Sequence, residues 1–151
     1  MGHTYTSLLM HVIFSTKNRR PTLRADFRQR LYEYMNGLGQ PEGIGEVLNL
    51  GGTDNHLHGL LGMRPDISPA EAMMRWKSLS SGWVHKTIPD AQDFGWQVGY
   101  AMLSIGRSSV PQLIQYIERQ EEHHRRQTFE DEFLAFLAKY EIEYDPKYVW
   151  D

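Results

Sequence analysis

The 151-residue sequence contains no cysteine, which excludes disulfide bonds, a thiolate nucleophile and cysteine ligands for zinc. It also lacks any run of about eighteen apolar residues, so no transmembrane helix is predicted. The first residues do not show the basic segment followed by an apolar stretch that is typical of a signal peptide. We therefore expect a cytoplasmic protein without membrane contacts.

A strong excess of charge of one sign is missing too. The net charge of −3 does not indicate a nucleic-acid-binding protein. The distribution is uneven, however, because residues 1–30 are mostly basic and residues 128–151 are mostly acidic. A local basic face can bind phosphates despite a negative total. The alternative is ordinary solvated charge.

The apolar content of 40% is enough for one core, so we expect a single domain over residues 1–151. Apolar periodicity predicts strands and helices in alternation, with Ser68 and Ser109 as helix N-caps and Gly59 loosening the strand that contains it. Strands are expected at 5–16, about 46–51, about 55–63 and 95–105, and helices at 22–38, from Ser68, at 109–126 and at 129–140. This order predicts an α+β, ferredoxin-like (split β-α-β) fold: an antiparallel sheet with helices on one face, followed by two further helices.

Two histidines lie on one face of the third predicted strand. His56 and His58 flank Leu57, and side chains alternate between the faces of a strand, so both imidazoles point the same way. Two imidazoles in this arrangement can share one metal ion. The alternative is a pair of half-buried histidines, each satisfied by a hydrogen bond. The first and third strands are central in this fold, which places the histidine strand inside the sheet.

The predicted helix at 109–126 carries a second group of polar residues. Tyr116, Gln120 and His123 fall on one stripe beside the apolar face. The alternative is an amphipathic helix with a tyrosine at its border. Chemically, a tyrosine hydroxyl can attack a phosphodiester and hold the bond energy as a phosphotyrosine. His56, His58 and the amide oxygen of Gln120 could hold Mg²⁺ or Mn²⁺ beside it.

Three stretches together resemble the single-tyrosine HUH transposases of the IS200-like type, which include REP-associated tyrosine transposases. They are the segment 56–58 (His-Leu-His), the tyrosine helix 116–124 and the first strand with its basic turn, 11–20. The tail from Phe129 to Trp150 is also similar. The resemblance spans nearly the whole chain.

This resemblance implies an enzyme that cuts and rejoins single-stranded DNA at hairpin-bearing ends through a 5′-phosphotyrosine intermediate. It implies Tyr116 as nucleophile, His56, His58 and Gln120 as ligands of Mg²⁺ or Mn²⁺, and His123 as a possible accessory residue. Expected partners are hairpin-bearing single-stranded DNA and a second copy in a homodimer with shared active sites, in the bacterial cytoplasm at the nucleoid. Candidate DNA contacts are Lys17, Arg19, Arg20, Arg75, Lys77 and Ser81, with the acidic C-terminal segment away from the DNA.

Two other functions fit the residues. One is a domesticated protein of the same fold that binds hairpin DNA without strand transfer. The other is a dimeric ferredoxin-like protein that binds a metal for structure or for small-molecule chemistry.

Overall fold

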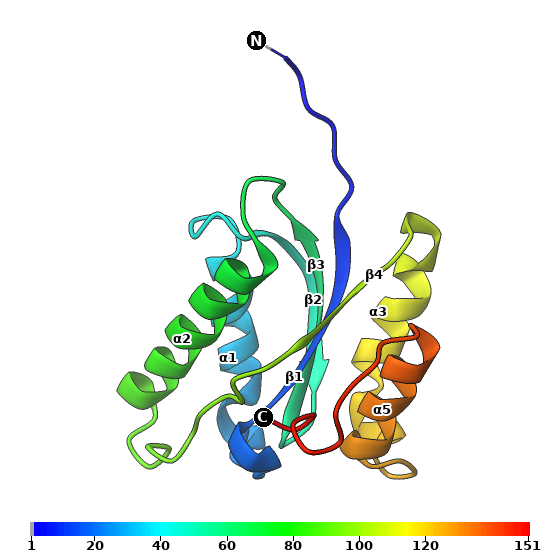
Figure 1. Ribbon diagram of the computed structural model, residues 1–151. Helices are drawn as coiled ribbons and strands as arrows, with labels where there is room; N and C mark the ends of the chain where they lie inside the picture. Colours follow the sequence, from blue (N-terminus) through cyan, green and yellow to red (C-terminus); the bar gives the residue numbers. More distant parts are fainter. Residues whose placement is uncertain (1) are drawn as a thin grey trace.

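The computed structural model describes residues 2–151 and places a four-stranded sheet between two layers of helices (Figure 1). All neighbouring strands are antiparallel, in the order β2-β3-β1-β4. This confirms the ferredoxin-like sheet and the central position of the histidine strand. The strands are β1 (Leu9–Ser15), β2 (Gly45–Gly52), β3 (His56–Met63) and β4 (Ala101–Ser104).

Helices α1 (Ala25–Leu38) and α2 (Pro69–Thr87) cover one face of the sheet (Figure 1). The side chain of Ser68 accepts a hydrogen bond from Glu71 N and caps α2, as its sequence predicts. Trp76 of α2 is fully buried under β3. A Cβ atom at Gly59 would lie 3.2 Å from this indole, so glycine provides the space in which Trp76 packs.

The C-terminal helices cover the opposite face of the sheet (Figure 1). They are α3 (Val110–Glu118), the short α4 (Gln120–His123) and α5 (Phe129–Lys139). Alternation along β3 separates the two layers. Leu57 joins the core under α1 and α2, whereas Leu60 packs with Ile117 of α3.

Two predicted strands are longer than the strands of the structure. The first begins at Leu9 rather than residue 5, and the preceding residues project as an extended arm (Figure 1). Its neighbour β3 ends at Met63, whose N–H donates to Leu8 O, so the arm has no strand beside it. The fourth begins at Ala101 rather than residue 95, although Trp96 forms an isolated antiparallel bridge to Thr16. Between them the pairing is interrupted, because the Gln97 side chain accepts a hydrogen bond from Ser15 N and Gly99 N donates to Asp151 O.

The predicted helix at 109–126 is broken. Its start is a 3₁₀ turn, η2 (Arg107–Ser109), and Ser109 has helical backbone angles without a side-chain cap. Arg119, at φ −103° and ψ 21°, separates α3 from α4. Tyr116 and Gln120 therefore lie on different helices, and the Gln120 side chain is 1% exposed.

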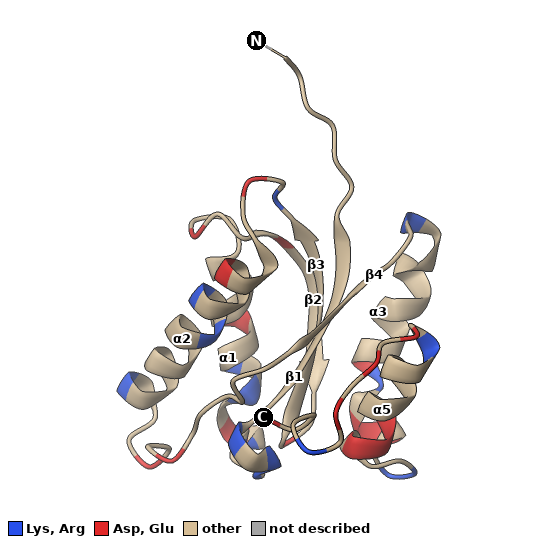
Figure 2. Cartoon of the chain, in the orientation of Figure 1, with Lys and Arg blue, Asp and Glu red and all other residues tan. Residues whose placement is uncertain are grey.

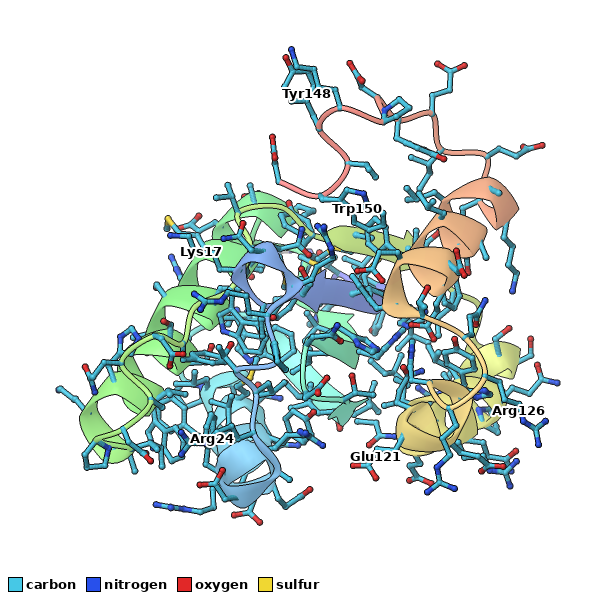
Figure 3. The ribbon with its side chains drawn as sticks, turned by 90° about the horizontal axis from the view of Figure 1, so that it is seen from below. Lys17, Arg24, Glu121, Arg126, Tyr148 and Trp150 are labelled. Carbon is cyan, nitrogen blue, oxygen red and sulfur yellow. The ribbon has the colours of Figure 1, made fainter. Side chains whose placement is uncertain are left out.

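The C-terminal segment packs against the second helical layer. Trp150 contacts Phe129 and Phe133 of α5, whereas Tyr148 is 55% exposed (Figure 3). Thr128 caps α5 by accepting a hydrogen bond from Asp131 N. Within residues 2–151, no helix combines the length and the apolar character that membrane crossing requires.

Candidate active site

Three histidines of the two central strands form the floor of a buried polar group. His56 and His58 come from β3 and His11 from β1, and each is at most 1% exposed. They share the face of the sheet that α3 and α5 cover. The predicted strand geometry of His56 and His58 is therefore present, and His11 joins them because β1 runs beside β3.

The neighbours of each imidazole determine which ring nitrogen faces the site. His58 Nδ1 lies 2.8 Å from His11 Nε2, and the two rings stack with centroids 5.0 Å apart. Burial and the neighbouring His58 lower the pKa of His11 to about 3, so His11 is neutral and can accept a hydrogen bond from His58 Nδ1. That tautomer would leave the Nε2 lone pair of His58 free for a metal, whereas in the metal-free protein Nε2 faces Glu132.

In His56, too, neighbouring side chains contact Nδ1 and the other ring nitrogen, Nε2, faces the site. Its Nδ1 lies 2.9 Å from Asn55 Oδ1 and 3.0 Å from Thr53 Oγ1, in the turn before β3. Burial and the neighbouring His58 lower the pKa of His56 to about 3. A proton on Nδ1, donated to Asn55, leaves Nε2 of His56 free to bind a metal inside the site.

A carboxylate from α5 completes this group. Glu132 Oε1 lies 2.8 Å from His58 Nε2, 3.2 Å from His124 Nε2 and 3.6 Å from His56 Nε2. Burial by itself raises the pKa of Glu132, but hydrogen bonds from His124 and His58 outweigh burial and hold the pKa well below its usual value. Glu132 is therefore a buried anion, 2% exposed.

Tyr116 of α3 and Gln120 of α4 contact the same carboxylate. The Tyr116 hydroxyl donates to Glu132 Oε2, and Gln120 Nε2 donates to the same oxygen at 3.3 Å. Gln120 Oε1 lies 2.9 Å from His56 Nε2. Burial and the Glu132 carboxylate raise the pKa of Tyr116 above its usual value, so the phenol is neutral.

The donor set fits a divalent cation. Ligand atoms of His56, His58 and Glu132 all lie within 4.8 Å of one another. Metal binding would require both Nε2 atoms to be deprotonated, and a cation would then replace the proton between His58 Nε2 and Glu132 Oε1, which lie 2.8 Å apart. The amide oxygen of Gln120 adds a fourth donor beside His56. Two imidazoles with oxygen donors are compatible with several divalent ions.

The residue patterns of the sequence did not predict Glu132, His11 or His124 as site residues. A signal for Glu132 is present in α5, because this acidic residue lies three positions after Phe129 and four before Phe136, on the apolar stripe. His124 contacts Gln120 and Glu132. The predicted accessory residue His123 instead packs its ring 4.6 Å from the Tyr116 ring.

The candidate DNA contacts do not lie at this site. Arg75 and Lys77 belong to α2, across the sheet, and the Lys77 ammonium donates to Val98 O and Gly99 O. Arg75 donates to Glu42 O and to Glu71. Lys17, Lys77 and Ser81 line a surface cavity of about 620 Å³ between α2 and the segment 92–100.

The acidic C-terminal segment, which was expected to lie away from the DNA, contacts the basic turn that supplies two of the candidate DNA contacts. Arg19 of η1 (Lys17–Arg19) forms an ion pair with Glu130 at 2.9 Å and lies over the Trp150 ring. Arg20 is exposed beside it. The first turn of α5 therefore neutralises part of the basic turn, because α5 and Trp150 of the C-terminal segment lie beside η1.

Comparison with known proteins identifies one family. Residues 4–120 match the family model described as "Transposase IS200 like", which includes the positions of His56, His58, Tyr116 and Gln120 but not Glu132. No protein with a curated description matches the chain significantly.

Two solved structures resemble the chain. One is a proposed transposase from Deinococcus radiodurans R1, with a TM-score of 0.58 and 25% identity over 80% of this chain and 96% of that one. The other is a REP-associated tyrosine transposase bound to a REP hairpin, with a TM-score of 0.60 and 14% identity over 82% of this chain and 73% of that one. At 14% identity the second likeness concerns the fold alone.

Proposed function

The chain belongs to the family of IS200-like transposases, and from this premise we propose that it cuts and rejoins single-stranded DNA with Tyr116 as the nucleophile. The observation that carries the proposal is the contact between the Tyr116 hydroxyl and Glu132, which also contacts His58. A nucleophile, a metal-binding group and a buried carboxylate thus meet within one site.

The proposed reaction exchanges one bond for another. The Tyr116 oxygen attacks the phosphorus of the scissile phosphodiester, and the bond between phosphorus and the 3′ oxygen breaks. The products are a 5′-phosphotyrosine and a 3′ hydroxyl, which takes up a proton from solvent. Glu132 Oε2 already accepts the hydrogen bond of the Tyr116 hydroxyl and is the nearest acceptor for its proton. Reversal with a different 3′ hydroxyl rejoins the strand.

We propose that His56, His58 and Glu132, with Gln120 beside them, hold Mg²⁺ or Mn²⁺. Such an ion would neutralise the charge that develops on the scissile phosphate and offset the charge of Glu132. His11 and Asn55 keep the two metal-binding nitrogens directed into the site. Because a neutral phenol is a poor nucleophile, we expect little cleavage without a divalent ion.

We propose that the DNA carries a hairpin, as in the REP-associated relative, whose structure contains one. The cavity between α2 and the segment 92–100 could take part in binding it, because it combines Lys17, Ser81 and aromatic walls. A homodimer remains part of the proposal. In the single chain, however, Tyr116 already contacts Glu132, so we assign each tyrosine to the site of its own chain.

The proposal is tested by trapping DNA on the protein. Wild-type protein and a Tyr116→Phe variant are mixed with Mn²⁺ and hairpin-bearing single strands that carry a label 3′ of the hairpin. We expect label to remain on the wild type through denaturing electrophoresis and to be absent from the variant. Binding of the hairpin without any trapped label would instead support a hairpin-binding protein without strand transfer.

A further inference from the structure

A cavity of about 490 Å³ opens beside Tyr116, between η2, α3 and α5. Its volume lies within the range of roughly 300–1,000 Å³ that is usual for small-ligand sites. The lining includes the ring of Tyr116 and one charged side chain, Lys139, but no carboxylate. Figure 2 shows that the sign of the charge changes along α5, because its acidic residues lie in its first turn and its last residue is Lys139.

A smaller cavity of about 140 Å³ adjoins the first. Tyr116, Phe136 and Lys139 line both cavities, and Glu132 lines the smaller one. An extended strand that follows the two cavities would therefore pass the Tyr116 hydroxyl. Lys139 would lie beside that strand on the α5 side.

The walls of the larger cavity are suited to a nucleobase. Phe136 and Tyr140 provide aromatic surfaces, and bases stack on aromatic rings irrespective of sequence. Ser104, Ser109 and Gln112 provide hydrogen-bonding groups for a base edge. The cation of Lys139 suits a phosphate.

We propose that this cavity binds the nucleotide next to the scissile phosphate, with its base against Phe136 and Tyr140 and its phosphate at Lys139. The inference rests on the proposed function and adds to it a subsite that selects where the strand is cut. Gln112 would read the base edge, and Lys139 would hold the backbone.

The position of the nucleotide can be tested in the Tyr116→Phe protein, which retains uncleaved DNA. The probes are hairpin-bearing single strands with one 4-thiothymidine at successive positions of the unpaired flank. We expect photocrosslinks from one flank position to map to the segment 136–140. Crosslinks confined to other segments, or no binding of the probes, would overturn the subsite.

Paired variants test the two side chains separately. Lys139→Met should reduce the slope of log affinity against log salt concentration by about 0.7, the value for one phosphate contact on single strands. Lys147→Met, on the C-terminal tail and outside both cavities, should leave the slope unchanged. Equal slopes for wild type and Lys139→Met would contradict the phosphate contact.

Selection from strands with randomised flanks tests the base contact. Gln112→Leu should change the preferred base at the crosslinked position, whereas Gln115→Leu, exposed on the same helix but outside the cavity, should not. An unchanged preference in Gln112→Leu would overturn base recognition by this residue. Cleavage by the wild type in the trapping assay would in that case still support the proposed function.

Discussion

At the scale of single residues, Glu132 links the two halves of the site, the histidines of the sheet and Tyr116 of α3. One oxygen contacts His58 Nε2 and the other accepts the Tyr116 hydrogen bond. A buried carboxylate is costly unless it is paired, and in the protein alone the histidines and the phenol stabilise it. We propose that its partner during catalysis is a divalent cation.

Glu132→Gln should therefore weaken Mn²⁺ binding. The substitution retains the shape of the side chain and removes its charge. The loss should be at least the roughly 10- to 100-fold that removal of an outer-shell partner costs. Isothermal titration with Mn²⁺ measures it. Glu130→Gln, two residues away on α5 and paired with Arg19, is the matched control. Equal affinities for the two variants would show that Glu132 is not a ligand.

Lys77 gives a prediction about stability and pH. Burial lowers the pKa of its ammonium group from 10.5 to about 8 in the folded protein. Between these values the unfolded chain binds more protons, so stability rises with pH. The free energy of unfolding of wild type minus that of Lys77→Met should increase between about pH 7 and about pH 9.5. Urea unfolding at both pH values measures it, and a constant or falling difference would contradict the buried position.

Residue spacing singled out four positions of the candidate site, of which His56 and His58 have the predicted strand geometry, whereas Tyr116 and Gln120 lie on two helices rather than on one. His56 and His58 are recognisable because a strand places them two residues apart, and Tyr116 and Gln120 because they lie four apart near an apolar face. Glu132, His11 and His124 reach the site through the packing of α5 and the pairing of β1 with β3. The only local sign of that packing is the position of Glu132 on the apolar stripe of α5.

At the scale of helices and strands, the position of α3 depends on a close contact with the edge strand β2. A Cβ atom at Gly51 would lie 2.5 Å from Ile117 O and 2.8 Å from Ile117 Cγ2. Glycine therefore lets the helix backbone approach the sheet. Because Tyr116 precedes Ile117, the same contact positions the proposed nucleophile.

Gly51→Ala should displace α3 and reduce strand cleavage. We expect the free energy of unfolding to fall by about 1–3 kcal/mol, the usual cost of overpacking. The amount of trapped DNA should fall by a larger fraction than the free energy of unfolding does. Gly82→Ala is the control, because a Cβ atom there meets nothing within 4 Å and alanine should add about 0.5–1 kcal/mol within a helix. Thermal unfolding and the trapping assay measure both effects. Unchanged activity in Gly51→Ala would exclude this contact as the one that positions Tyr116.

Periodicity identified the elements better than their ends. Ser68 and Pro69 start α2 because the cap is local. The 95–105 strand was predicted too long because its pairing is interrupted between Trp96, which forms an isolated bridge to Thr16, and Ala101, where a side chain and the C-terminus take the hydrogen bonds of Ser15 N and Gly99 N. The break at Arg119 was missed because residues 118–126 contain no apolar side chain whose spacing could mark it. Its effect is to turn Gln120 toward His56.

At the scale of the whole molecule, a single chain contains every group of the candidate site. Tyr116 contacts Glu132 of its own chain, and Glu132 contacts His58. The resemblance alone predicted sites shared between two copies. The sequence could not distinguish the two arrangements, because helix periodicity does not say which copy a helix packs against.

Mixing two inactive variants tests this arrangement. Tyr116→Phe lacks the proposed nucleophile and His58→Gln lacks a proposed metal ligand, so neither should trap DNA alone. If each tyrosine serves its own chain, no mixed assembly contains an intact site and the mixture should remain inactive. A control with wild type and each variant shows whether the proteins interfere with one another. Restored trapping in the mixture would show that copies share sites.

Identification of the residue that carries trapped DNA is the most direct test of Tyr116 as the nucleophile. Wild-type protein is incubated with Mn²⁺ and the hairpin-bearing strands, digested with nuclease and protease, and analysed by mass spectrometry. We predict a deoxynucleotide linked through its 5′ phosphate to Tyr116. A linkage to any other residue, or strand cleavage that leaves no protein-bound nucleotide, would contradict this assignment.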